Sequence, residues 1–271
     1  MSHSPLTGFQ LFITTWYQQF GRHDLPWRIT FEPYTILVSE LMLQQTQVER
    51  VIPKFTAFLN RFPTISSLAQ AQQKEVLTLW QGLGYNRRAV FLHKCAQVVS
   101  HGFAGIFPET REELLKLPGV GPYTASALAA FAFNQPVNLI ETNIRAVFIH
   151  HFFAEQEKVS DTELLPLIEQ ELLKTNPRLW YSALMDYGSF LKRTLPNPSK
   201  KSKHHTLQSK FAGSLRQARG EIIRLLTSEE YLSLSQLKKR MLSNIIHIEP
   251  ALTQLIQEQM IHSTQKGYTL S

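Results

Sequence analysis

One acidic side chain stands out because it lies in an apolar segment beside a run of amides. Glu40 belongs to PYTILVSELMLQQTQVERVIPKF, residues 33–55, where its neighbours are chiefly isoleucine, leucine, valine and methionine. We expect burial to raise the pKa of this carboxyl group and to favour a general-acid role. The alternative is a glutamate on a helix surface. The polar side chains that follow can hydrogen-bond base edges or fill a vacated base stack: Gln44, Gln45, Thr46 and Gln47.

Two glycine-containing segments carry groups that suit a phosphate backbone. LPGVGP, residues 117–122, joins two apolar runs, so that Gly119 and Gly121 can turn N–H groups outward where the second helix starts. The alternative is an ordinary helix end followed by a proline-started helix. LWQGLGYNRRA, residues 79–89, offers an exposed Tyr85 beside Arg87 and Arg88. An aromatic ring beside cations suits insertion between bases.

The elements that position these groups are predicted to be helices. Apolar residues recur at helical spacing as far as about Leu191, which predicts an all-α body of roughly ten short helices. Residues 192–210 are predicted to form a basic linker or an ordered basic loop. Residues 211–271 are predicted to form three helices and a β-hairpin, the order of a winged helix-turn-helix. Such modules bind DNA or dock proteins, and both alternatives stay open.

Composition excludes several classes of protein. The 271 residues are 43% hydrophobic and 18% charged, as in ordinary soluble globular proteins. No stretch approaches the ~20 apolar residues of a membrane span, and the N-terminus carries no secretory pattern. We therefore expect a cytoplasmic protein. The single cysteine, Cys95, rules out an intramolecular disulfide and an all-cysteine metal site.

The positive charge is concentrated in the last third of the chain. From Lys192 onward there are 13 Lys and Arg against 5 Asp and Glu, whereas the preceding residues hold 15 against 16. A basic segment on a neutral body favours a polyanionic partner, because bound phosphates release condensed counterions. A solvated basic tail is the alternative.

Six motifs, in this order, resemble the helix-hairpin-helix (HhH-GPD) DNA glycosylases and, within them, the adenine glycosylase (MutY-type) branch. They are LPWR, VSELMLQQTQVERVIPKF, LWQGLGYNRRAVFLHKCAQVV, FPETREELLKLPGVGPYTASAL, ETNIRAV and MDYGSF, and the resemblance covers about residues 10–191. It implies a two-lobed all-α fold with a small C-terminal α+β domain. Residues 24–134 would form a six-helix barrel lobe, and residues 1–23 plus 135–191 a second helical lobe.

The resemblance also implies the chemistry. Such enzymes flip a base out of double-stranded DNA and hydrolyse its N-glycosidic bond. Glu40 matches the acid that protonates the purine, and Tyr123 lines the pocket where bifunctional relatives carry lysine, which implies base removal alone. Trp27 and Asp186 match supporting residues. The candidates for DNA contact are Arg28, Gln44, Gln45, Thr46, Tyr85, Arg87, Arg88, Gly119, Val120, Gly121, Thr124, Asn143, Arg145, Lys200 and Lys201.

The sequence departs from the family in three places. Glu141 stands where the family has an aspartate that stabilises the positive sugar, and its extra methylene changes the reach of the carboxylate. Positions of the four cysteines that hold an iron–sulfur cluster are occupied by Lys192, Ser199, Ser202 and Gln208, so we expect neither cluster nor other metal. The short winged-helix-like tail replaces the usual oxidised-guanine domain.

The leading hypothesis is a clusterless, monofunctional DNA glycosylase of base excision repair that removes adenine opposite 8-oxoguanine or guanine. The first alternative keeps the fold and removes mismatched thymine or uracil. The second is a non-catalytic DNA-binding protein. We expect a monomer, with the C-terminal domain available to a protein partner.

Overall fold

The structure is a computed structural model that describes residues 6–207, 209–242 and 245–271. Contacts divide these residues into two compact units. The first holds the chain up to Ile36, Pro108–Lys116 and Val120–Leu207. The second holds Leu37–Phe107, Leu117–Gly119 and the residues from Ser209 onward.

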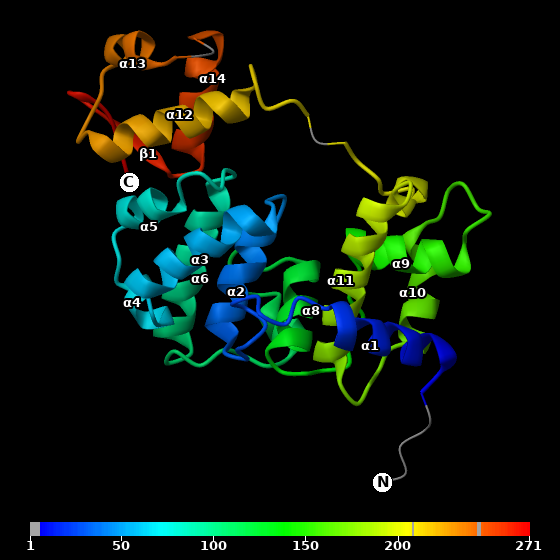
Figure 1. Ribbon diagram of the computed structural model, residues 1–271. Helices are drawn as coiled ribbons and strands as arrows, with labels where there is room; N and C mark the ends of the chain where they lie inside the picture. Colours follow the sequence, from blue (N-terminus) through cyan, green and yellow to red (C-terminus); the bar gives the residue numbers. More distant parts are fainter. Residues whose placement is uncertain (1–5, 208, 243–244) are drawn as a thin grey trace. The chain divides into compact units, whose positions relative to one another are not determined.

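The first unit is built on two long contacting helices. Its elements are α1 (Gly8–Phe20), α7 (Arg111–Leu114), α8 (Pro122–Phe131), α9 (Thr142–Phe152), α10 (Asp161–Gln170), α11 (Pro177–Thr194) and the 3-10 helix η1 (Pro198–Lys201). Helix α11 packs against α9, α1 and α8 (Figure 1). The fully buried Trp180 and Tyr181 lie on this helix. Proline at the first position and an Asn176 cap define its start.

Gly188 explains how closely α9 and α11 can approach. A β-carbon on Gly188 would lie 2.7 Å from the carbonyl carbon of Asn143, at the start of α9. No side chain fits there without moving backbone. The glycine in the MDYGSF motif therefore sets the position of the helix end that carries Glu141.

The second unit starts with a bundle of helices and ends with the C-terminal module, residues 209–271. Helix α2 (Pro33–Leu43) begins in the first unit and ends in this one, and is followed by α3 (Val48–Arg61), α4 (Ile65–Ala69), α5 (Gln73–Trp80) and α6 (Arg87–Gly102). Phe58, Phe62 and Trp80 are fully buried and meet edge to face. Aromatic burial of this kind stabilises the bundle.

The C-terminal module has the predicted winged-helix order. It contains α12 (Leu215–Ser228), α13 (Leu234–Arg240), the 3-10 helix η2 (Ile245–His247), α14 (Ile248–Gln257), β1 (Ile261–Thr264) and β2 (Gly267–Leu270). The strands pair antiparallel, with Ile261 opposite Leu270. Helix α12 packs on α14 and on α5 (Figure 1).

The structure confirms the predicted fold class. In the described ranges, helices dominate and paired strands occur in the C-terminal hairpin. Helix α2 ends at Leu43, so the polar run from Gln44 to Gln47 is a turn rather than a continuation of the helix. The domain boundaries stay predictions; the compact units place α8 and residues 24–36 in the first unit. No helix in the described ranges is both long and apolar enough to cross a bilayer.

Candidate functional site

Glu40 is a buried carboxylate on α2. It is 7% exposed, and the adjacent Ser39 and Leu41 are also buried. The structure therefore confirms the predicted desolvated environment and excludes the helix-surface alternative. Water removal favours the protonated form of a carboxyl group, which is the state that a general acid needs. The raised pKa itself stays a prediction.

A buried arginine holds the end of this helix. Arg88 donates from Nη1 to the carbonyl oxygens of Leu41 and Gln44, each at 2.6 Å, and to that of Met42 at 3.1 Å. From Nη2 it donates to the carbonyl of Gly84 at 2.9 Å. Burial lowers the pKa of Arg88 to about 10. One guanidinium thus satisfies the orphan carbonyls of a helix end and joins them to a second loop.

The two loops joined by Arg88 each carry a strained residue. Gln45 has φ +55° and Tyr85 has φ +48°, the left-handed region that non-glycine residues rarely adopt. Each directly follows a carbonyl that accepts from Arg88. Such outliers persist where the surroundings over-determine them, commonly at functional sites. Gln45 is exposed, whereas Tyr85 is half-buried, which corrects the prediction that Tyr85 is exposed.

This arrangement corrects one predicted DNA contact, while that of Thr46 stays a prediction. Arg88 is buried and donates to the protein's own carbonyls, so it is not available as a phosphate ligand. The hydroxyl of Thr46 accepts from Arg88 and so belongs to the same network. Arg87 is exposed and stacks over Phe91, with its guanidinium carbon 5.0 Å from the ring centre.

The two glycines of the hairpin have different roles. Gly119 has φ +75°, and a β-carbon there would lie 3.0 Å from Cγ of Phe91, so both conformation and space require glycine. Gly121 has φ −83° and nothing within 4 Å, so neither its backbone conformation nor its surroundings require glycine. Gly121 is the N-cap of α8 and makes no side-chain hydrogen bond there. Helix N-termini of this kind bind anions.

Helix α8 also carries the predicted pocket residue. Tyr123 lies in its first turn and is half-buried. Thr124 is only 2% exposed, and Val120 is buried. Burial contradicts a side-chain contact of Thr124 with DNA, because its hydroxyl faces the protein interior.

Glu141 is fixed at the start of α9. Its Oε1 accepts from the backbone N–H groups of Asn143 at 2.7 Å and Ile144 at 3.0 Å, and its Oε2 accepts from Nδ2 of Asn143 at 3.2 Å. The side chain is therefore the N-cap of the helix. The hydrogen bonds hold the longer glutamate in one place, and the predicted DNA contact of Asn143 stays a prediction.

Lys192 lies in the electrostatic field of Glu141. Burial lowers the pKa of Lys192, and the negative charge of Glu141 opposes that shift. Arg145 is committed elsewhere: its Nε and Nη2 donate to the two oxygens of Asp161, each at 2.7 Å. This bidentate pair holds the pKa of Asp161 below its usual value. The predicted DNA contact of Arg145 is thereby corrected to an internal ion pair.

Asp186 anchors the chain that follows α1. Its carboxylate is 2% exposed; Oδ2 accepts from the N–H of Arg22 at 2.8 Å, and Oδ1 accepts from Nη2 of Arg28 at 3.4 Å. Arg28 also donates to the Tyr17 hydroxyl at 3.3 Å. The supporting role predicted for Asp186 agrees with this geometry, whereas Arg28 is an internal partner rather than a DNA ligand. Trp27 is buried next to it.

The residues at the cluster positions do not fit an iron–sulfur cluster. Lys192 is a cation, and Ser199 and Ser202 are buried hydroxyls in internal hydrogen bonds, where a cluster needs thiolates. Gln208 lies outside the described residues. The segment is instead tied by backbone: Val159 accepts from the N–H of Lys203 and donates to the carbonyl of Lys201, both at 2.8 Å.

The cations of this segment divide into two kinds. Lys200 and Arg193 are exposed. Lys201 donates to the carbonyl of Ala154, and Lys203 lies 3.8 Å from Glu163. Lys200 thus keeps its predicted role as a phosphate-contact candidate, while Lys201 is partly occupied within the protein. In the described part of the chain, no group of three His, Cys, Asp or Glu residues is arranged to hold a metal.

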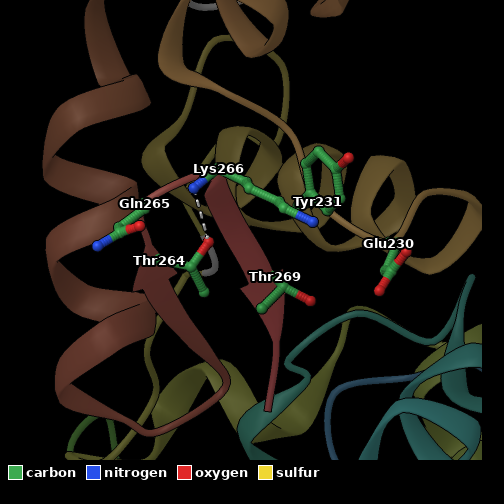
Figure 2. Close-up of a pocket in the computed structure, with 6 residues that line it drawn as sticks. All are labelled: Glu230, Tyr231, Thr264, Gln265, Lys266 and Thr269. Atoms are coloured by element: carbon green, nitrogen blue, oxygen red, sulfur yellow. Dashed lines mark hydrogen bonds between the residues drawn. The ribbon is translucent and has the colours of Figure 1, made fainter.

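A pocket of about 340 Å³ lies at the hairpin of the C-terminal module (Figure 2). The ammonium group of Lys266 lies 5.1 Å from the centre of the Tyr231 ring, and Glu230 also lines the pocket. None of the predicted catalytic residues lines it. Its single carboxylate lacks a partner acid or base for hydrolysis, so the pocket is separate from the predicted chemistry.

The sequence-predicted residues fall into two sets. Glu40, Gln45 and Tyr85 belong to the second unit, whereas Tyr123 and Glu141 belong to the first. The resemblance to the DNA glycosylases implies that Glu40 and Glu141 face one base pocket, and this stays a prediction because the two residues belong to different units. Two functional candidates were missed. Gly188 was quoted in a motif without a role, and Arg216, which contacts Tyr85, carried no local signal beyond its charge.

The chain is similar to known DNA repair proteins. A family model described as "HhH-GPD superfamily base excision DNA repair protein" matches residues 38–170. An adenine DNA glycosylase of Mycolicibacterium smegmatis is 34% identical over 98% of this chain and 95% of its own. One of Buchnera aphidicola subsp. Baizongia pistaciae is 39% identical over 66% of this chain, and the match spans 51% of that relative.

A solved structure supports the fold independently. The structure of a thermostable thymine-DNA glycosylase superposes with a TM-score of 0.58 at 26% identity, and the match covers 67% of this chain and 84% of that one.

Proposed function

The chain belongs to the adenine DNA glycosylase family of the HhH-GPD superfamily of base excision DNA repair proteins, and from this premise we propose that it removes adenine from mispairs in double-stranded DNA. The observation that carries the proposal is the buried carboxyl group of Glu40, held on a helix whose end Arg88 fixes. A purine leaves readily only when its ring is protonated, and a desolvated carboxyl group can supply that proton.

The reaction is a hydrolysis. Glu40 gives a proton to the adenine ring, the bond between C1′ and the base nitrogen breaks, and the electron pair of that bond leaves with the base. Glu141 stabilises the positive charge that develops on the sugar. Water adds to C1′ and gives up a proton, which leaves free adenine and an abasic site. The tyrosine at position 123 supplies no amine to attack C1′, so strand cleavage does not accompany base removal.

Duplex DNA is the proposed macromolecular partner. The N-terminus of α8 at Gly121 would hold one phosphate through N–H groups, without reading a base. Exposed Arg87, Lys200 and Arg193 would add cationic contacts. Gln45 and Tyr85, on the strained loop tips, would enter the duplex around the extruded nucleotide. We propose a monomer acting at the nucleoid, with a surface of the C-terminal module open to a protein partner.

We also propose that the enzyme works without an iron–sulfur cluster. The internal hydrogen bonds of Ser199, Ser202 and Val159 would give residues 192–207 their order. A visible absorbance band from a cluster, present in stoichiometric amount in purified protein, would contradict this.

A substrate panel tests the activity. Duplexes with adenine opposite 8-oxoguanine or guanine are incubated with enzyme, and abasic sites are cleaved with alkali. We expect product with wild type and a loss of at least about 100-fold for Glu40→Gln, because the amide cannot donate the acid proton. Equal rates for wild type and Glu40→Gln would refute the role of Glu40.

Thymine or uracil opposite guanine is the second candidate substrate, because a thymine-DNA glycosylase is among the similar structures. Duplexes carrying those mismatches are included in the same panel. Faster removal of a pyrimidine than of adenine would favour it. Binding without any base removal would favour a non-catalytic role.

A further inference from the structure

The C-terminal module is docked on the same unit that carries Tyr85. Polar contacts join it to α5, α6 and the loop between them. From α5, Gln73 donates to the carbonyl of Gln259 at 2.9 Å and Lys74 to that of Glu229 at 3.4 Å. From α6, Lys94 donates to Oε1 of Gln259 at 2.9 Å, and from the loop Gln81 donates to the hydroxyl of Thr227. The α12 helix packs along α5. The module is therefore attached to the helices on both sides of the Tyr85 loop.

One side chain of the module reaches Tyr85 itself. Arg216, in the first turn of α12, donates from Nη1 to the Tyr85 hydroxyl, and its guanidinium carbon lies 5.1 Å from the ring centre. The guanidinium of Arg88 lies 5.5 Å from the same ring. Arg216 also lies 5.4 Å from the ring of Phe211 and donates to the carbonyl of Ser209 at 3.1 Å. Tyr85 is thus held by two cations, one from its own loop and one from the module.

The hydrogen bonds of Arg216 do not by themselves explain the position of its side chain. Its Nε–H is buried and has no acceptor among the described residues. A buried donor without a partner carries a desolvation cost and calls for an explanation other than simple packing. Holding the aromatic ring supplies that explanation, because a cation beside an aromatic ring is stabilising.

We propose that Arg216 is a positioning residue for Tyr85, through which the C-terminal module takes part in recognition of the mispair. The inference rests on the proposed function, in which Tyr85 enters the duplex. The Arg88 hydrogen bond fixes the backbone before Tyr85, and Arg216 fixes the ring and hydroxyl. With both in place the ring meets DNA in one orientation, so little ordering is left to be done on binding.

Single-turnover excision rates test the role. Arg216→Ala is expected to slow adenine excision about 3- to 30-fold, the range of a cation–aromatic contact. Arg216→Lys keeps the charge without the planar guanidinium and should fall between. Arg224→Ala is the matched control, since Arg224 lies on the same helix, is half exposed and pairs with Glu221 at 3.7 Å. Its rate should equal that of wild type.

A double-mutant cycle shows whether Arg216 acts through Tyr85. In the Tyr85→Ala background, the Arg216→Ala substitution should have much less effect than in wild type. An equal loss in both backgrounds, or a wild-type rate for Arg216→Ala, would overturn the proposal. The proposal would also be overturned if the excision rate fell in proportion to the melting temperature of the variants and Arg216→Lys were as slow as Arg216→Ala.

A second readout does not depend on excision. Protein labelled with 3-fluorotyrosine gives a ¹⁹F resonance for Tyr85, assigned by its absence in Tyr85→Phe. Arg216→Ala should shift and sharpen that resonance and weaken binding to a mispair duplex, while Arg224→Ala changes neither. If wild type excises no base, the proposed function fails, and these two measurements still decide the Arg216 inference. An unchanged resonance and affinity would refute it.

Discussion

Arg88 donates a 2.9 Å hydrogen bond to the carbonyl oxygen of Gly84, which belongs to the peptide bond between Gly84 and Tyr85. The same guanidinium donates to the carbonyl of Gln44, directly before Gln45. Two loop tips that are distant in sequence are thus fixed by one buried cation. The backbone of both is set by main-chain acceptors rather than by the side chains that they display.

Replacement of Arg88 by lysine should show how much this network contributes. Lysine cannot span both loops, so buried carbonyls lose their donors. We expect the free energy of unfolding, measured by urea denaturation, to fall by at least about 3 kcal/mol. Arg87→Lys, at the exposed neighbouring position, should change it by less than about 0.5 kcal/mol. Similar values for the two variants would contradict the clamp.

Glu141→Gln separates charge from structure. The amide oxygen can still accept from the N–H groups at the start of α9, so stability should stay within about 1 kcal/mol of wild type. Adenine excision should fall by at least about 100-fold, because the charge that stabilises the developing cation is lost. Glu141→Asp keeps the charge and should retain excision. Full activity of the glutamine variant would remove Glu141 from the chemistry.

Two glycine-to-alanine substitutions should have opposite signs. Gly188→Ala places a methyl group against the backbone of Asn143, and we expect a destabilisation of about 1–3 kcal/mol from overpacking. Gly220→Ala, inside α12 with nothing within 4 Å, should instead stabilise by about 0.5–1 kcal/mol. Thermal and urea unfolding measure both. A neutral Gly188→Ala would show that α9 and α11 separate at little cost.

The hairpin glycines should also behave differently. Gly119→Ala is expected to cost about 1–3 kcal/mol of stability, because φ is positive and Phe91 occupies the space. Gly121→Ala should fold normally, yet its methyl group lies at the N-terminus of α8. We expect duplex affinity, measured by fluorescence anisotropy, to weaken about two- to fivefold. Unchanged affinity would mean that this helix end does not hold a phosphate.

His93 should make the protein sensitive to acid. Burial lowers the pKa of the His93 imidazole, and backbone hydrogen bonds with Ala71 and Ala69 oppose the shift. The folded state therefore binds its proton less readily than the unfolded state, whose value is about 6.5. Stability should be full above that value and fall as pH drops below it towards the lowered pKa.

Urea unfolding at pH 7.5 and 5.5 measures this loss. His93→Gln should show a smaller decrease in stability between the two pH values. His101→Gln, at an exposed position on the same helix, should lose as much as wild type does. An identical decrease in the His93 variant would assign the acid sensitivity to other groups.

The helices and the C-terminal module were predictable because their signals are local. Apolar spacing, caps and glycine turns act within a few residues, and they placed α12, α13, α14 and the hairpin correctly. Burial of Glu40 followed from its apolar neighbours for the same reason. The role of Arg88 at the end of α2 could not be predicted, because the carbonyl groups that accept from it lie more than 40 residues away in the sequence.

The arginine roles could not be predicted, because they depend on partners far along the chain. Charge and motif position suggested DNA contacts for Arg28, Arg88 and Arg145. Arg28 meets Asp186, Arg145 meets Asp161, and Arg88 meets backbone carbonyls. The requirement for glycine at position 188 could not be predicted either, since it comes from the backbone of another helix. A single sequence does not show whether an arginine side chain is exposed and able to bind a phosphate or is paired with a group inside the protein.

The Arg88 network has a consequence for how such an enzyme can change. Because Arg88 binds main-chain carbonyl groups, the side chains at positions 45 and 85 can be replaced while the backbone of the two loops keeps its shape. Single substitutions at these two positions can then change which lesion, or which flanking bases, the enzyme prefers. The loop backbone does not have to change with them. Directed libraries restricted to those two positions would sample altered selectivity on an intact scaffold.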